Sequence, residues 1–210
     1  MAGLREELKH EVDWRFEEIT TLKTLHIKHK FTDLQEKIIQ KYSIPSFYSL
    51  WEGFVTTGFS IYIRYINQLD LSAIQLSKNI LVHDLDAKYN LSDGRKNFDK
   101  KISLVGDIYN YIKERVNLRT KISTQANVNF RVINDILCRF NLELLPEVPF
   151  NKDIDKLVHF RNNIAHGEVI HALDDILIDK LSITTMDSIY EVFTRIIDGY
   201  QNQSYLKSPL

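Results

Sequence analysis

The chain has 210 residues, of which 44% are hydrophobic and 26% charged, so it can bury a core and has the composition of a soluble globular protein. Its 27 basic and 28 acidic residues give a formal net charge of −1, and global charge therefore gives no argument for nucleic-acid binding. No apolar run approaches the roughly 18 residues of a membrane span, and the charged N-terminus does not resemble a signal peptide. The single cysteine, Cys138, excludes an internal disulfide and is expected as a buried thiol, which favours a cytoplasmic location.

Only seven glycines and four prolines interrupt the chain, which predicts a mostly helical protein. Apolar spacing predicts a first helix over residues 4–30 and a second helical pattern over 31–42. Pro45 is expected to end that pattern, because it lacks an N–H donor and disfavours the α conformation of the residue before it. Ser46 then has a side chain suited to cap the next helix.

That next helix is predicted over residues 47–68 and is apolar nearly all round, so it should be central. Glu52 falls within it. A carboxylate in the middle of a core helix needs a partner or lies at an interface.

The region 70–120 is the least regular and is expected to be inserted or elaborated. Residues 71–82 fit a helix, residues 84–94 fit a polar loop, and residues 97–116 fit a basic helix. The apolar positions expected on the inner face of that basic helix are Ile102, Val105, Ile108, Tyr109 and Ile112.

A further helix is predicted over residues 129–141. The helix after it is expected to begin with a cap at Asn151 or Asp153 and to end at Gly167, since glycine commonly terminates helices.

A short link with apolar residues near 173–178 should lead to a last helix over residues 185–200 and a polar tail over 201–210 that frays. With no repeat or low-complexity tract, residues 1–210 are interpreted as one helical domain.

Local charge differs from global charge between residues 95 and 121, where basic residues outnumber acidic ones by five. Such a segment is either a solvated helix face or a surface that faces phosphates. The basic residues that we consider for RNA contact are Lys100, Lys101, Lys113, Arg115, Arg119 and Lys121.

Several kinds of site have no pattern in this chain. There is no glycine-rich phosphate loop, no nucleophilic serine elbow and no Cys/His quartet, so we expect no cofactor and no dedicated metal site. The carboxylates of Asp174, Asp175 and Asp179 are interpreted as the polar face of a linker.

The most informative segment runs from Arg161 to His166. Arg161 continues an apolar stripe with helical spacing, where an unpaired cation would cost several kcal/mol. Arg161 either pairs with a carboxylate such as Glu52 or Asp155, or it belongs to a functional site. His166 follows five residues later, so on an ideal helix the two side chains point about 140° apart. The residues that make up the stripe with Arg161 are Ile154, Leu157, Val158 and Ala165.

The sequence Arg161-Asn-Asn-Ile-Ala-His166 resembles the Arg-x4–6-His motif of the HEPN superfamily of helical RNA-cleaving and RNA-binding proteins. Three blocks, at residues 50–54, 126–130 and 155–158, look like a prokaryotic branch of stand-alone HEPN nucleases that are often associated with toxin–antitoxin or phage-defence loci. The resemblance covers residues 4–200, and within 70–120 it consists of helical character alone.

This resemblance implies an all-α, antiparallel helical bundle with additional helices, which dimerises so that two motif helices face each other. It implies a metal-independent endoribonuclease whose products are a 2′,3′-cyclic phosphate and a 5′-hydroxyl. Arg161 would bind the scissile phosphate, His166 would move protons, and Asn162 would orient His166 or the phosphate. Glu52 as a support for Arg161 is our own inference.

The resemblance also implies partners and an alternative. The expected partners are RNA, a second copy of the chain, and an antitoxin or defence protein. Some HEPN toxins carry a tyrosine two residues after the histidine, which a partner enzyme modifies, whereas this chain has Glu168 there. The alternative is a non-catalytic helical module that binds RNA or protein through the same dimer groove.

Overall fold

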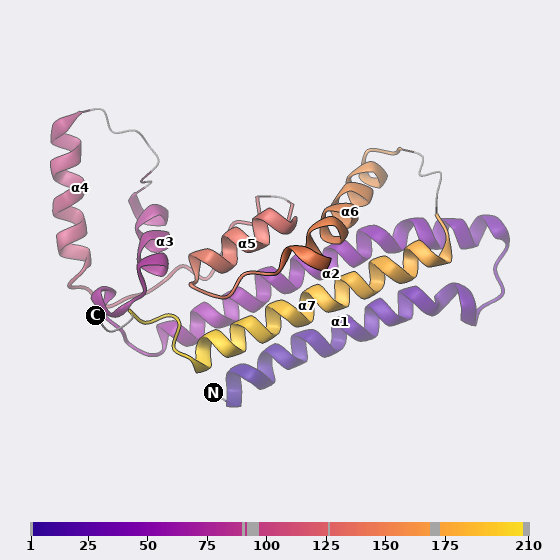
Figure 1. Cartoon of the computed structure of the whole chain (residues 1–210), viewed down its shortest axis with the longest axis horizontal. Helices are drawn as coiled ribbons and strands as arrows, with labels where there is room; N and C mark the ends of the chain where they lie inside the picture. The colour runs from indigo at the N-terminus through magenta and orange to yellow at the C-terminus, as the bar shows by residue number, and fades with distance from the viewer. Residues whose placement is uncertain (1, 90, 92–96, 126, 169–172, 208–210) are drawn as a thin grey trace.

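The computed structural model describes residues 2–89, 91, 97–125, 127–168 and 173–207, and within them it is helical with no β-strand (Figure 1). The predicted all-α class is therefore confirmed. The elements are α1 (Ala2–Lys28), α2 (Asp33–Asn67), the short 3-10 helix η1 (Ala73–Gln75), α3 (Lys78–Tyr89), α4 (Phe98–Tyr111), α5 (Phe130–Arg139), α6 (Glu147–Ala165) and α7 (Asp175–Gln201).

Three long helices, α1, α2 and α7, pack against one another and form the body of the molecule. Helix α1 runs opposite to α2, whereas α7 runs in the same direction as α2, so the bundle is antiparallel only in part (Figure 1). Helix α6 packs on α2 and α7, and α5 packs on α6. Helices α3 and α4 stand at the end of the body opposite the C-terminal end of α6 (Figure 1).

Helix α2 continues through Pro45, so the predicted break there is wrong. A proline inside a helix costs about 3 kcal/mol or more. The residues around it, Ile44, Phe47 and Tyr48, are all buried, and each large apolar side chain that is fully buried contributes about 1.5–3 kcal/mol. Burial therefore outweighs the local preference. Ser46 does not cap a helix, and its hydroxyl donates to the Tyr42 carbonyl at 3.1 Å.

The start of α2 is fixed by a capping box instead. The Thr32 hydroxyl accepts a hydrogen bond from Gln35 N–H, and the Gln35 side chain accepts from Thr32 N–H at 2.9 Å. The predicted central position of the helix is confirmed, since its aromatic side chains fill the core. The fully buried ones are Phe47, Trp51, Phe54, Phe59 and Tyr62.

The region 70–120 differs from expectation in three places. Residues 71–77 do not form the expected helix, because they hold the short η1 and α3 begins only at Lys78. Residues 84–89 are helical within α3, because Asp84 and Leu85 are buried and the Asp84 carboxylate accepts a hydrogen bond from the Tyr111 hydroxyl of α4. The apolar face of α4 is mostly exposed to solvent, because no described element covers it. Its exposed apolar residues are Phe98, Ile102, Val105 and Tyr109.

The C-terminal third also departs from prediction. Helix α6 begins at Glu147, before both expected caps, with an extended backbone at Val148. Helix α7 begins at Asp175, with Asp174 as its N-cap, so the expected linker is helical. A tertiary contact prevents fraying after α7, since Lys207 N–H donates to the Gln75 carbonyl at 2.8 Å.

Cys138 is exposed, in contrast to the buried thiol that we expected, because it lies on the outer side of α5. Among the described residues, no helix combines the length and apolar character needed to cross a membrane.

Candidate functional site

Helix α6 ends as its sequence predicts, at a glycine in the left-handed conformation. Gly167 has φ +78°, and its N–H donates to the Ile164 carbonyl at 3.0 Å. The next N–H, of Glu168, reaches back to the Asn163 carbonyl at 2.9 Å. These two bonds form a Schellman motif, which satisfies carbonyls at the helix end. The motif fixes the point at which the backbone leaves the helix, which is the C-cap residue His166.

The segment before α5 is held against α2 by two aromatic side chains. The Tyr48 hydroxyl accepts from Val128 N–H at 2.9 Å, and the Trp51 indole N–H donates to the Val128 carbonyl at 2.8 Å. Both polar groups of this buried residue are thus satisfied. Two residues further on, Phe130 N–H donates to the Asp155 carboxylate of α6 at 3.0 Å. The segment therefore joins α2 to α6.

Arg161 lies where these elements meet. Its guanidinium stacks over the Tyr48 ring, with 4.7 Å from Cζ to the ring centroid. Its Nη1 donates to the side-chain oxygens of Asn162 at 2.8 Å and Asn127 at 3.4 Å. A guanidinium has five N–H donors. Nε and Nη2 donate to no atom of the described residues, so one edge of the fork remains for a ligand.

The carboxylates that we considered as partners of Arg161 serve other groups. No ion pair joins Arg161 to either Glu52 or Asp155, all three of which are described. Asp155 binds the Phe130 N–H. Glu52 interacts with the Tyr48 hydroxyl, so it supports Arg161 only indirectly, through the ring on which the guanidinium lies.

Burial raises the pKa of Tyr48 to about 12, and the charge of Glu52 and its hydrogen bond to the hydroxyl raise it further, against the lowering effects of Val128 N–H and Arg161. Tyr48 is therefore neutral at physiological pH. A neutral ring with an occupied hydroxyl provides a rigid apolar support for the cation.

His166 is exposed, and its side chain makes no hydrogen bond to Arg161 or Asn162 among the described contacts. Asn162 contributes to the geometry twice: its side chain accepts from Arg161, and its backbone carbonyl accepts from His166 N–H at 3.0 Å. Asn162 is thus brought together with Arg161, rather than with the imidazole of His166. Among the described residues, no hydrogen bond joins the side chains of Arg161 and His166.

The basic residues of the 95–121 segment lie elsewhere. Lys100 and Lys101 are on α4, at the opposite end of the molecule from the C-terminal end of α6 (Figure 1). Arg115 pairs with Asp70 at 3.5 Å. Lys113, Arg119 and Lys121 are exposed. Within the part of the chain that is described, no three His, Cys, Asp or Glu side chains are placed to share a metal ion.

Comparison with known protein families identifies the family of this chain. A family model described as HEPN_MAE_28990-like HEPN matches residues 4–205, almost the whole chain. The chain belongs to this HEPN family. HEPN domains are commonly ribonucleases. No curated protein and no solved structure matches this HEPN chain.

The sequence did not reveal which residues hold the Arg161 side chain in place. Tyr48 and Asn127 contact Arg161 from positions far away in the sequence, and only the position of Tyr48 one turn before Glu52 hinted at a role. The most buried arginine is also not Arg161 but Arg15, whose Nε donates to the Leu50 carbonyl at 3.2 Å and whose Nη1 pairs with Glu11. Arg15 is bonded within the fold at both Nε and Nη1, whereas only Nη1 of Arg161 donates to a described residue.

Proposed function

We propose that this HEPN protein is a metal-independent endoribonuclease that acts as a homodimer, as a toxin or a defence effector. The observation that supports this proposal most directly is the free edge of Arg161. Its guanidinium is fixed by Tyr48, Asn127 and Asn162, while Nε and Nη2 remain available. Two parallel N–H donors match two oxygens of a phosphodiester, and a preformed fork does not need to reorganise during the reaction.

In the proposed reaction, the ribose 2′-oxygen attacks the adjacent phosphorus and the bond from phosphorus to the 5′-oxygen breaks. The 2′-hydroxyl loses a proton and the leaving 5′-oxygen gains one, so the products are a 2′,3′-cyclic phosphate and a 5′-hydroxyl. Arg161 stabilises the charge that develops on the phosphoryl oxygens. His166 transfers a proton at one of the two oxygens, because an imidazole can act as a general acid or a general base.

A second copy of the chain would complete the site. Helix α2 carries three exposed apolar residues at four-residue spacing, namely Leu34, Ile38 and Tyr42, which are 70%, 47% and 58% exposed. Leu34 and Glu52 are separated by five helical turns and so share a face of α2. A partner copy on this face is proposed to bring its own motif helix alongside.

The catalytic test uses total RNA in the presence of EDTA. Wild-type protein should cut RNA and leave 2′,3′-cyclic phosphate ends, whereas Arg161→Ala and His166→Ala should each lower the rate by about 100-fold or more. His159→Ala is a matched control, because His159 lies on the same helix, is exposed and contacts Asn163 at 3.1 Å. If the double variant Arg161→Ala, His166→Ala cuts as fast as wild type, the proposal is wrong.

The second candidate function is RNA binding without cleavage, which is favoured by the lack of a hydrogen bond between the Arg161 and His166 side chains among the described residues. It predicts binding that weakens as salt rises, because phosphate contacts release counterions. The exposed basic residues Lys113, Arg119 and Lys121 would then contribute through the RNA backbone. Binding that Arg161→Ala weakens, together with no new RNA ends, would select this function.

A further inference from the structure

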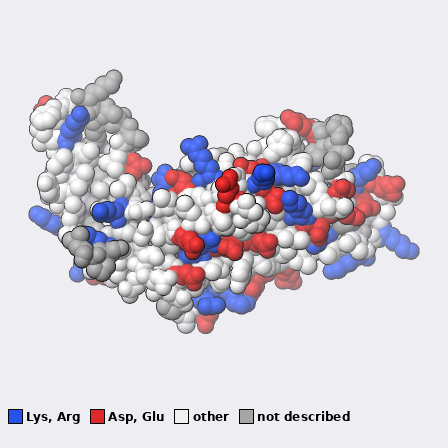
Figure 2. Space-filling view, viewed as in Figure 1, with Lys and Arg blue, Asp and Glu red and all other residues white. Residues whose placement is uncertain are grey.

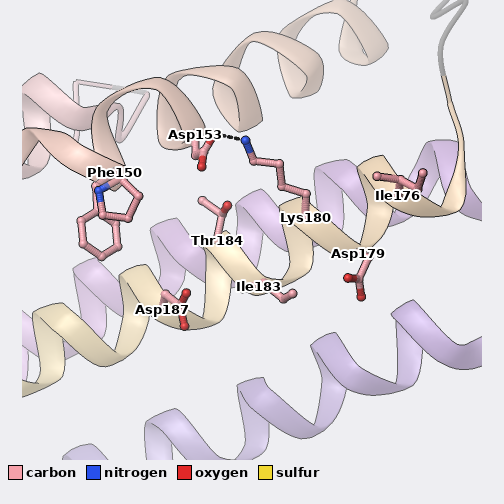
Figure 3. Close-up of a pocket in the computed structure, with 9 residues that line it drawn as sticks. Phe150, Asp153, Ile176, Asp179, Lys180, Ile183, Thr184 and Asp187 are labelled. Atoms are coloured by element: carbon pink, nitrogen blue, oxygen red, sulfur yellow. Dashed lines mark ion pairs between the residues drawn. The ribbon is translucent and has the colours of Figure 1, made fainter.

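Exposed apolar side chains follow the outside of α7 from Ile176 to Tyr190. Two cavities of about 310 and 330 Å³ lie on either side of the first turns of α7, one towards α6 and one towards α1, and both are lined by Ile176 and Asp179 (Figure 3). Because they share these residues, the two cavities flank one strip of exposed surface that follows α7.

The floor of this strip is apolar and has a seven-residue period. Ile176, Ile183 and Tyr190 are 79%, 43% and 54% exposed, and they follow one another along α7 at intervals of seven. In a coiled coil this spacing places side chains along the seam that faces a partner helix. Val148 of α6 and Ile27 of α1 add exposed apolar side chains on the two sides. The shape and the period fit a single helix laid along α7.

The rim of the strip is acidic. The carboxylates of Asp153, Asp175, Asp179 and Asp187 line it, against only two lysines. Lys180 pairs with Asp153 at 2.6 Å (Figure 3). Lys23 of α1 pairs with Asp179. Figure 2 shows acidic side chains over the middle of this face.

Among the acidic residues of the rim, Asp187 is the one most relevant to a positively charged partner. No ion pair joins Asp187 to a described cation. Burial raises the pKa of Asp187, and the nearby charge of Glu191 raises it further. A cation of a partner would therefore meet here an acidic side chain that no described cation pairs with.

We infer that this strip on α7 binds an amphipathic helix of a different protein, whose apolar heptad positions cover Ile176, Ile183 and Tyr190 and whose lysine or arginine side chains pair with the acidic rim. A second copy of the chain is a poor occupant, because a symmetric contact would set this acidic face against itself. RNA is a poor occupant for the same reason, since its phosphates would meet carboxylates. The inference does not depend on ribonuclease activity.

The experiment is a display selection on the immobilised full-length protein. The library holds helical peptides of about three heptads, with apolar residues at the heptad seam and Lys, Arg, Glu or Gln drawn at random beside it. Selection uses the wild-type protein alone, and the variants are kept for the later affinity measurements. Enriched peptides should carry Lys or Arg beside the seam, and their affinity should fall at least about tenfold on Ile183→Glu and on Ile176→Glu, as expected for central contacts.

Two variants test the role of the acidic rim and the location of the binding surface. Asp187→Lys should weaken binding of the basic peptides and favour peptides that carry Glu at the same positions, because the repulsive element is reversed. Val82→Glu, at an exposed apolar residue of α3, should change nothing. Circular dichroism of each variant checks that the helices are retained.

The inference is overturned if selection returns no peptide, if the peptides bind Ile183→Glu as well as wild type, or if they carry acidic residues beside the seam. It is also overturned if wild-type protein self-associates in light scattering and Ile183→Glu abolishes that association, because the strip is then a contact between copies. None of these outcomes depends on RNA cleavage, so failure here and failure of the ribonuclease proposal are distinguishable.

Discussion

The guanidinium of Arg161 lies over the ring of Tyr48, at 4.7 Å, while the Tyr48 hydroxyl accepts a hydrogen bond from Val128 N–H. One buried side chain therefore supports the arginine with its face and the segment before α5 with its oxygen. The two contributions are separable, because phenylalanine keeps the face and lacks the oxygen.

Replacing Tyr48 by phenylalanine should lower the free energy of unfolding while leaving the site largely intact. The buried Val128 N–H would lose its acceptor, which costs about 1–3 kcal/mol. The ring under Arg161 remains, so RNA cleavage should fall much less than in Tyr48→Leu, which removes the aromatic face. Urea unfolding and an RNA cleavage assay measure the two effects, with the exposed Tyr109→Phe as control. Equal loss of cleavage in Tyr48→Phe and Arg161→Ala would contradict this division of roles.

Alkaline pH should destabilise the fold through the same tyrosine. Burial raises the pKa of Tyr48 to about 12 and also raises the pKa values of Tyr62 and Tyr111. In the unfolded chain a tyrosine loses its proton near pH 10. The stabilisation is therefore complete below pH 10 and is lost as pH rises towards 12, because the unfolded state binds fewer protons there. Unfolding free energies between pH 9 and 12 should fall less steeply for Tyr48→Phe than for wild type. Identical slopes would show that Tyr48 titrates normally.

The Glu52→Gln variant tests whether this carboxylate serves Tyr48 or Arg161. The charge of Glu52 raises the pKa of Tyr48, and no ion pair joins Glu52 to Arg161. The variant should therefore lower the pKa of Tyr48, measured by NMR of ¹³C-labelled tyrosine, and leave RNA cleavage within a few-fold of wild type. Glu18→Gln, on the exposed surface of α1, is the control. A loss of cleavage as large as that of Arg161→Ala would instead restore the direct support that the sequence predicted.

Sequence patterns predicted the helical class because apolar spacing reports which face of a segment is buried. They failed at Pro45, where a local rule predicted a break and the burial of Ile44 and Phe47 kept α2 continuous. They failed again on α4, since periodicity identifies an apolar face but does not say whether another element covers it. Val105 was expected inside and is exposed.

Only part of the candidate site could be predicted from the sequence. The glycine that ends α6 is a local feature, so the end of this helix was predicted correctly, whereas the roles of Arg161 and His166 stay predictions. The partners of Arg161 were not predicted. Tyr48 and Asn127 reach it only because α2 and the segment before α5 pack against α6, and no local pattern encodes such a contact.

Replacing Gly167 by alanine should shift the end of α6. At φ +78° an L side chain is strained, at a cost of about 1 kcal/mol. The Schellman bonds that position His166 should loosen, so cleavage should fall along with the melting temperature. Gly106→Ala is a matched control with the opposite sign, because nothing lies within 4 Å of its Cβ position and alanine favours a helix by about 0.5–1 kcal/mol. Equal stability of the two variants would contradict the assignment of Gly167 as an obligatory left-handed position.

Gly199 tests how closely α7 packs beneath the turn that follows α5. A Cβ at this position would lie 2.0 Å from Cδ2 of Leu142, so that side chain must move. Gly199→Ala should therefore lower the free energy of unfolding by about 1–3 kcal/mol, as overpacked cores do.

Leu142→Ala should lower the free energy of unfolding by about 2–5 kcal/mol, because it leaves a cavity. In the double variant the added methyl occupies part of that cavity, so the two losses should not add. Urea unfolding of the four proteins gives the coupling energy, which we expect to exceed about 1 kcal/mol in the favourable direction. Additive losses would mean that the two residues do not compete for space and that α7 lies further from Leu142 than the structure places it.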